Sequence, residues 1–271
     1  MGSHSARRRP GGTEQATPLR RAWAVRGVAV TIETRGEWFT GEPQAAVLPV
    51  PRLTYHFLAA VDIEAFSGFD TLDQVILQSR LRDVLERAAR QARLNRELWH
   101  VQVNGDGELA VLPGDIDGSQ LVADYPRELA RALTEANAEA GEGPRLRIRV
   151  ALHHGAVVAG GHGPVGPAPI EVSRLLNLEA LRRELRRRPN EDLVLIVSSA
   201  LYRDVVESRL RGLDPADFFF VSEEVKGRAF PGHIYRGGGS PRRRADREPI
   251  RLRSTPKTPR LGRWRFGKRA S

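Results

Sequence analysis

The chain has 271 residues, of which 40% are hydrophobic, and it carries a formal net charge of +10. This length and composition are those of a soluble globular protein that can bury a core. The absence of cysteine excludes disulfides, thiolate metal sites and cysteine nucleophiles. The longest apolar runs, such as Leu193–Val197, are far too short to cross a bilayer.

The positive charge is concentrated at the two ends of the chain. Residues 237–271 hold twelve Lys/Arg against two Asp/Glu, and residues 1–21 hold five Arg against one Glu. The middle is therefore mildly acidic, and the overall charge does not make it a nucleic-acid binder. The N-terminus lacks the apolar segment of a secretory signal, so we expect a cytoplasmic location.

We expect three segments along the chain. Residues 1–50 are predicted to be a basic, disordered N-terminus and linker with a short strand or hairpin, because apolar residues alternate between Val25 and Ile32. Residues 51–236 form the predicted folded domain, and residues 237–271 a basic, disordered tail.

The first half of the domain begins with an apolar strand, Tyr55–Val61, that stops at Asp62. A helix is predicted over 70–94 from its apolar spacing, with Asp70 or Thr71 as N-cap. Strands 99–103 and 108–112 flank Asn104-Gly105-Asp106-Gly107, which is a strong hairpin signal.

The second half alternates further helices and strands. We predict helices over 126–140, 171–188 and 199–208, and strands over 146–152, 193–197, 217–221 and 232–235, with 156–159 pairing with 146–152. This order favours an α+β fold, a mixed β-sheet with flanking helices.

Two acidic residues stand out by their context. Asp62 lies where a strand stops, and Asp106 lies at a hairpin tip. If the strands are neighbours, the two carboxylates converge. Two converging carboxylates suit Mg²⁺, which prefers oxygen ligands, and a pair of such ions is a recurrent feature of sites that catalyse phosphoryl chemistry. The alternative is structural: Asp62 caps the following turn, and Asp106 serves a backbone that needs positive φ.

Six segments in order resemble the class III nucleotidyl cyclases, the family of adenylate and guanylate cyclase catalytic domains. They are spread across about 180 residues and correspond to the two metal-aspartate segments, the "RIGIHTGxVVxG" strand region, the "A-S/A-R-L/M" segment and the closing "VS-x-x-x-Y" and "VKG…VY" elements. They are 62–67, 104–107, 147–160, 172–175, 196–202 and 225–235. The resemblance implies the family's ferredoxin-like, palm-type fold.

The resemblance also implies roles for single residues. Asp62 and Asp106 would hold two Mg²⁺ or Mn²⁺ ions per site, with the backbone carbonyl of Ile63. Arg174 would be catalytic and stabilise charge on the α-phosphate. Lys226 falls near a phosphate-contacting lysine, or is a solvated turn lysine. Because the family's site lies between two domains, a homodimer is implied, with Arg174 facing the partner's aspartates.

Three positions depart from the family's pattern. Gln102 stands where the adenine-reading lysine would be, and an amide that both donates and accepts does not choose a base. The aspartate of the purine pair would lie near Gly163, and Ile170 replaces the ribose-orienting asparagine. A purine cyclase with unusual contacts, a pyrimidine cyclase and a domain that binds nucleotide without cyclising it all fit.

The leading hypothesis is a cyclase that converts a nucleoside triphosphate into a 3′,5′-cyclic nucleotide and pyrophosphate. The alternative is a catalytically silent module for nucleotide sensing or dimerisation. His153 and His154 are interpreted as structural, because adjacent strand residues point to opposite faces. Residues 182–188 are interpreted as a solvated basic helix end.

The basic tail has its own predicted role. Trp264 and Phe266 lie among its cations, so it is predicted to bind an anionic membrane surface or nucleic acid, the membrane being favoured, or to act as a solubilising tail without a partner. The cytoplasmic protein would then be membrane-peripheral.

Overall fold

The computed structural model describes residues 20–25, 28–33 and 51–236. The chain divides into two compact units between Val50 and Pro51. In the first unit, β1 (Arg20–Val25) pairs antiparallel with β2 (Val28–Glu33), as the alternation of apolar residues predicts. The predictions for residues 1–19, for the linker before Pro51 and for the tail fall outside the described residues.

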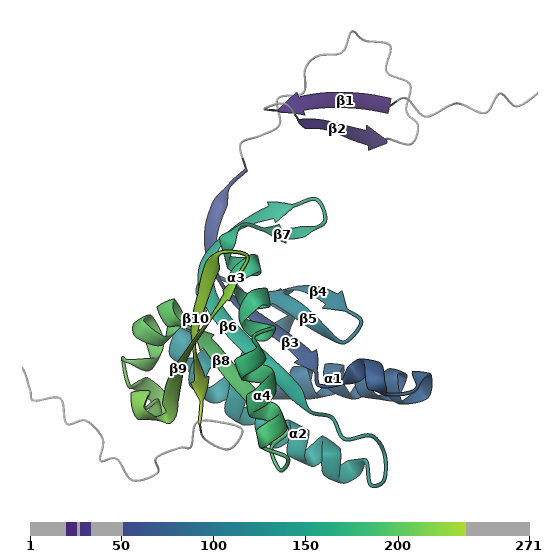
Figure 1. Cartoon of the computed structure of the whole chain (residues 1–271), viewed down its shortest axis with the longest axis vertical. Coiled ribbons are helices and arrows are strands. Elements are labelled where there is room, and N and C mark those ends of the chain that lie inside the picture. Colours follow the sequence, from purple (N-terminus) through teal and green to yellow (C-terminus); the bar gives the residue numbers. More distant parts are fainter. Residues whose placement is uncertain (1–19, 26–27, 34–50, 237–271) are drawn as a thin grey trace, which may run out of the picture. The chain divides into compact units, whose positions relative to one another are not determined.

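The second unit is built on one eight-stranded mixed sheet in the order β4-β5-β3-β6-β8-β10-β9, with β7 paired to β6 (Figure 1). Strands β6 and β8 run parallel, and the other neighbours run antiparallel. The strands are β3 (Leu53–Ile63), β4 (His100–Asn104), β5 (Gly107–Val111), β6 (Ile148–Gly160), β7 (Gly163–Val165), β8 (Leu193–Ser198), β9 (Phe218–Val225) and β10 (Arg228–Tyr235). The predicted α+β class with a mixed sheet and flanking helices is confirmed.

Helices α1 (Thr71–Gln91) and α2 (Tyr125–Glu139) cover one face of this sheet. Asp70 caps α1 by accepting a hydrogen bond from the amide of Asp73 at 2.9 Å, as predicted. Leu129 and Leu133 of α2 are fully buried in the cluster that holds the inward side chains of α1 and alternate residues of β3. This face contains the larger part of the core.

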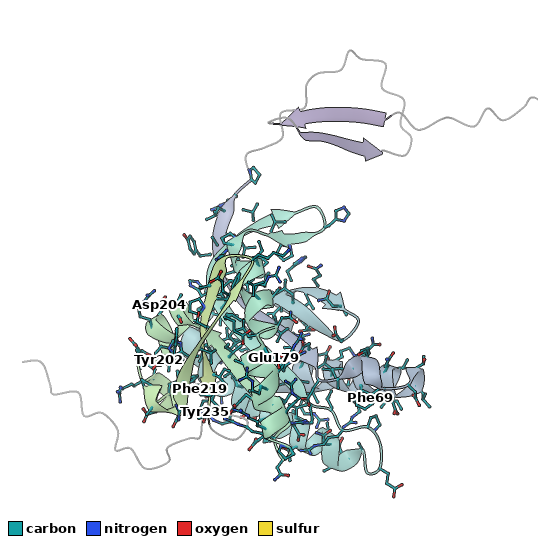
Figure 2. All side chains as sticks on the ribbon, viewed as in Figure 1. Phe69, Glu179, Tyr202, Asp204, Phe219 and Tyr235 are labelled. Atoms are coloured by element: carbon teal, nitrogen blue, oxygen red, sulfur yellow. The ribbon has the colours of Figure 1, made fainter. Side chains whose placement is uncertain are left out.

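Helices α3 (Pro167–Leu176) and α4 (Glu179–Arg187) lie on the other face, over β6, β8 and their neighbours, while β4 and β5 extend beyond them (Figure 1). The single helix predicted over 171–188 is wrong, because the chain breaks at Asn177 and Leu178. Glu223 of β9 accepts hydrogen bonds from the amides of Glu179 and Ala180, at 3.0 and 2.7 Å, and so caps α4. Figure 2 labels Glu179 at the start of this helix.

The predicted pairing of 156–159 with 146–152 is also wrong. Both segments belong to the single strand β6, which runs through Gly155 without a turn because β3 pairs with it from Leu53 to Ile63. The closing strands are longer than predicted and form a hairpin at Lys226 and Gly227, both with left-handed φ. The segment predicted as the helix 199–208 begins with α5 (Ser199–Leu201) and continues as a wider π-helical turn to Val206. No helix among the described residues is both long and apolar enough to span a membrane.

Candidate functional site

Asp62 occupies the end of β3 and is only 7% exposed. It lies opposite Arg149 of β6 in the strand register. The Arg149 guanidinium donates from Nε to Oδ1 at 2.7 Å and from Nη2 to Oδ2 at 2.6 Å. Burial raises the pKa of Asp62 to about 6, although the charge and hydrogen bonds of Arg149 act in the opposite direction. The carboxylate is therefore held by a guanidinium and does not cap the following turn.

Asp106 lies in the tight turn between β4 and β5, and it is exposed. Its carbonyl oxygen accepts a hydrogen bond from the amide of Ile63 at 2.8 Å, which fixes the turn beside the residue that follows Asp62. The charge of Asp106 also acts on Asp62 and contributes to its raised pKa. The structure therefore brings Asp62, Ile63 and Asp106 together at one end of the sheet.

Gly107 allows the β4–β5 hairpin to lie close to the end of β3. It lies opposite Asp62 in the register, and a Cβ on Gly107 would sit 1.9 Å from the carbonyl oxygen of Val61. The structural alternative is that Asp106 is present because the turn needs a positive φ, but neither Gly105 nor Asp106 has a positive φ. Backbone conformation therefore gives no reason for an aspartate at this tip.

Gln102 projects from β4 toward the turn between β6 and β7. A Cβ on Gly163, which has a φ of +125°, would lie 2.9 Å from the Gln102 Oε1 atom. The two positions expected to recognise the base are therefore neighbours in space. Ile170, on the first turns of α3, is 52% exposed, which is unusual for a large apolar side chain.

Arg174 and Lys226 do not contact the aspartates of their own chain. Arg174 lies on α3, partly buried, and its guanidinium makes no hydrogen bond or ion pair with any described residue. Lys226 is exposed at the tip of the β9–β10 hairpin. That tip is joined to α3 through Arg228, which donates to Glu171 at 2.8 Å.

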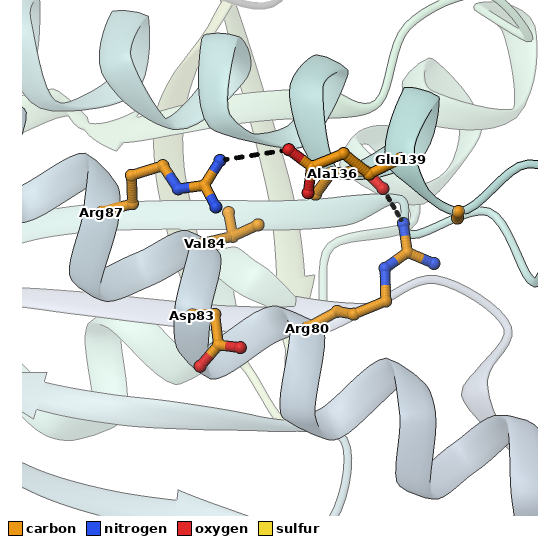
Figure 3. A pocket seen from close by; sticks show the side chains of 7 residues that line it. Arg80, Asp83, Val84, Arg87, Ala136 and Glu139 are labelled. Carbon is orange, nitrogen blue, oxygen red and sulfur yellow. Dashed lines mark hydrogen bonds and ion pairs between the residues drawn. The ribbon is translucent and has the colours of Figure 1, made fainter.

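His153 and His154 lie on opposite faces of the sheet, as the strand alternation predicts. His153 bonds through Nδ1 to the Ser198 hydroxyl at 2.8 Å, and His154 packs on Phe57 with ring centroids 4.5 Å apart. A separate hollow of about 180 Å³ lies between α1 and α2 (Figure 3). There Arg80 donates to the Ala136 carbonyl, near the end of α2, at 2.7 Å. This hollow belongs to the face that α1 and α2 cover, away from Asp62.

Arg149 and Arg182 are the charged residues that sequence reasoning missed at this site. Arg149 lies in the strand between buried Ile148 and Val150, and a lone charge in so apolar a strand is the signal that could have found it. Arg182 belongs to the stretch interpreted as solvated, yet it is partly buried and its charge acts on Asp62.

Comparison with solved structures identifies the architecture. The crystal structure of the guanylyl cyclase Cya2 is 16% identical to this chain, with a TM-score of 0.50 over 68% of this chain and 92% of that one. The domain has the fold of a nucleotide cyclase catalytic domain. The fold expected from the resemblance is thus confirmed.

Two further cyclase structures are similar at lower scores. A bacterial light-regulated adenylyl cyclase is 17% identical with a TM-score of 0.49, over 71% of this chain and 55% of that one, so this chain spans about half its length. An adenylate/guanylate cyclase/hydrolase from Silicibacter pomeroyi is 16% identical with a TM-score of 0.48, over 69% and 97%. No protein-family model and no curated protein sequence matches the chain.

Proposed function

We propose that the cyclase-fold domain is a nucleotide cyclase that uses a nucleoside triphosphate as substrate. The observation that carries this proposal is the placement of Asp62 and Asp106 side by side, joined through the Ile63 amide. In the reaction the 3′-oxygen forms a bond to the α-phosphorus, the bond from that phosphorus to the bridging oxygen breaks, and pyrophosphate leaves. The hydroxyl proton passes to solvent.

The residues present fit a pair of divalent cations with oxygen ligands. The exposed Asp106 carboxylate is available, and the Ile63 carbonyl lies between the two aspartates in the chain. An ionised carboxylate has about four lone-pair sites, so the two hydrogen bonds from Arg149 leave Asp62 able to bind a cation. Bound Mg²⁺ or Mn²⁺ would make the attacking hydroxyl more acidic and neutralise charge on the triphosphate.

Arg149 supplies the positive charge that keeps the buried Asp62 carboxylate ionised and oriented. Gln102, beside Gly163, contacts the base through its amide. Lys226 contacts phosphate from the hairpin tip.

A homodimer completes the proposed site. The part of the sheet formed by β4 and β5 extends beyond α3 and α4 (Figure 1), and Asp106 in the turn between these two strands is exposed. Arg174 makes no hydrogen bond or ion pair with the described residues of its own chain, so it is available to a partner's substrate. It would stabilise charge on the α-phosphate from across the interface.

The test is to incubate the protein with ATP, GTP, CTP and UTP, each with Mg²⁺ or Mn²⁺, and to identify products by mass. We expect one cyclic nucleotide, and we expect Asp106→Ala to lower its yield at least about a hundredfold without changing the melting temperature. Asp115→Ala removes another carboxylate from the domain and serves as a control. A cyclic product made equally well by Asp106→Ala would refute the site.

The shared site has a test of its own. Asp106→Ala and Arg174→Ala are each expected to be inactive, and mixing them should restore part of the activity. Asp106 is preferable to Asp62 here because removing Asp62 leaves Arg149 buried without its partner. No recovery in spite of demonstrated subunit exchange would contradict a site that is shared between chains.

A second candidate function is a silent module that binds nucleotide without turnover. The exposed Ile170 favours it, because an isoleucine cannot orient the ribose by hydrogen bonding. Tight nucleotide binding without product in either metal would decide for this module, and robust product formation would exclude it.

A further inference from the structure

The arginines of α4 differ in how their charges are compensated. Arg186 is paired with Glu179, and Arg188, just after the helix, is paired with Glu184. Arg183 and Arg187 are exposed to solvent. Arg182 is partly buried, and within the described part of the chain it has no carboxylate in contact.

The guanidinium of Arg182 also has unused donors. Its Nη2 donates to the Asn177 Oδ1 atom at 2.7 Å, while its Nε is buried without a hydrogen-bond partner. A buried donor that lacks an acceptor is costly. The position is therefore short of one hydrogen-bond acceptor, and an anionic one suits a guanidinium best.

The place of Arg182 indicates which anion would supply that acceptor. Alternation along β3 and β6 puts Asp62 and Arg149 on the sheet face that α4 covers. The Arg147 guanidinium, two residues before Arg149, donates from Nη2 to the Leu185 carbonyl of this helix at 2.6 Å, which ties α4 to the end of the sheet that carries Asp62. Arg182 thus borders the end of the sheet where the two carboxylates meet.

Asn177 fixes the direction of the Arg182 side chain. It sits in the break between α3 and α4, where its Nδ2 donates to the Ser173 carbonyl at 2.9 Å and its Oδ1 holds Arg182. The guanidinium is thereby held in place before a ligand binds, so contacting one would cost little conformational entropy.

We infer that Arg182 is a phosphate-binding residue that contacts the triphosphate held by Asp62 and Asp106 of its own chain. This inference rests on the proposed nucleotide site. It distinguishes Arg182 from Arg174, which is proposed to serve the partner's substrate. Phosphate oxygens match the guanidinium fork and supply the acceptor that Nε lacks.

The experiment measures binding instead of turnover. The probes are the 3′-deoxy forms of ATP, GTP, CTP and UTP with Mg²⁺, which lack the attacking hydroxyl, and the corresponding nucleosides, titrated calorimetrically. Arg182→Gln is compared with Arg183→Gln, which removes the same charge one position along the same helix. Arg182→Lys keeps the charge and removes the fork, and melting temperatures check folding.

We expect Arg182→Gln to weaken binding of the triphosphate roughly tenfold or more and to leave nucleoside binding unchanged. Arg183→Gln should change triphosphate binding less than about threefold, because an exposed charge acts weakly. Arg182→Lys should bind with intermediate affinity. A wild-type chain that binds none of the triphosphates would overturn the proposed function and this inference together. Triphosphate binding that Arg182→Gln leaves intact, or weakens no more than Arg183→Gln does, would overturn only the inference.

Discussion

The two faces of the sheet bury apolar clusters of different size, and each also holds a largely buried ion pair, Arg96–Glu108 on the face of α1 and α2 and Asp62–Arg149 on the other. Under α1 and α2, long apolar residues such as Leu77, Leu129 and Leu133 are fully enclosed, and both helices pack along the sheet. Under α3 and α4, a smaller apolar cluster gives way at the end of β3 to the buried ion pair of Asp62 and Arg149. The first face holds the larger apolar cluster, and the second carries the Asp62–Arg149 pair of the candidate site.

Variants in the larger apolar cluster are expected to affect stability through packing, and variants of the Asp62–Arg149 pair through charge. An apolar core loses stability in proportion to the cavity that a substitution leaves. A buried ion pair loses far more when one partner is removed than when both are replaced.

Replacing Arg149 with Met should destabilise the domain by about 4 kcal/mol at neutral pH, because the Asp62 carboxylate is left buried and unpaired. The double variant with Asp62→Asn should recover much of this loss. Urea unfolding of the two single variants and the double variant measures the coupling. Additive losses would show that the pair contributes nothing specific to this face.

Leu133→Ala should cost about 3 kcal/mol, because a fully buried leucine of α2 leaves a cavity in the larger core. Nucleotide binding by the folded fraction should not change. Leu210→Ala, at a leucine that is 55% exposed, is the matched control and should stay within about 0.5 kcal/mol of wild type. Weaker nucleotide binding by folded Leu133→Ala would mean that the two faces are not independent.

Acid should lower the free energy of unfolding of the domain through His153, which lies on the second face of the sheet. Burial, with smaller effects of the His154 and Arg228 charges, lowers the pKa of His153 from 6.5 to about 4. Between pH 6.5 and pH 4 the unfolded chain binds more protons than the folded chain. The contribution of neutral His153 to the free energy of unfolding is therefore complete above pH 6.5 and is lost as the pH falls toward 4. Wild type should lose about 2 kcal/mol more than His153→Gln between pH 7 and pH 4.5, measured by urea unfolding. Parallel pH profiles for the two proteins would contradict this.

The smallest expected effect concerns the start of α1. Asp70→Ala removes the side chain that accepts from the Asp73 amide and should cost about 1 kcal/mol. Asp83→Ala, at an exposed aspartate on the same helix, should change stability by less than half of that. Thermal melts of both variants provide the measurement, and equal shifts would contradict a specific role of the cap.

Local signals were enough to predict the elements that carry the two aspartates. The hairpin at Asn104–Gly107 and the strand that carries Asp62 near its end are both present. Because β3 pairs with β5, the two aspartates come together at one end of the sheet. The partner of Arg149 could not be predicted, because the pairing with Asp62 depends on the register between β3 and β6, which lie far apart in the sequence. The break between α3 and α4 was missed for a similar reason, since its cap is Glu223 of β9.

Gly107 sets a limit on how this chain can change. One added methyl group at this position would collide with the Val61 backbone and push the hairpin away from β3. The hydrogen bond between the Ile63 amide and the Asp106 carbonyl would then be lost, although both carboxylates would remain in the sequence. A sequence comparison that checks only the aspartates would count such a variant as intact. In this fold, the capacity to bring two carboxylates together is thus encoded as much by a missing side chain as by the acidic ones.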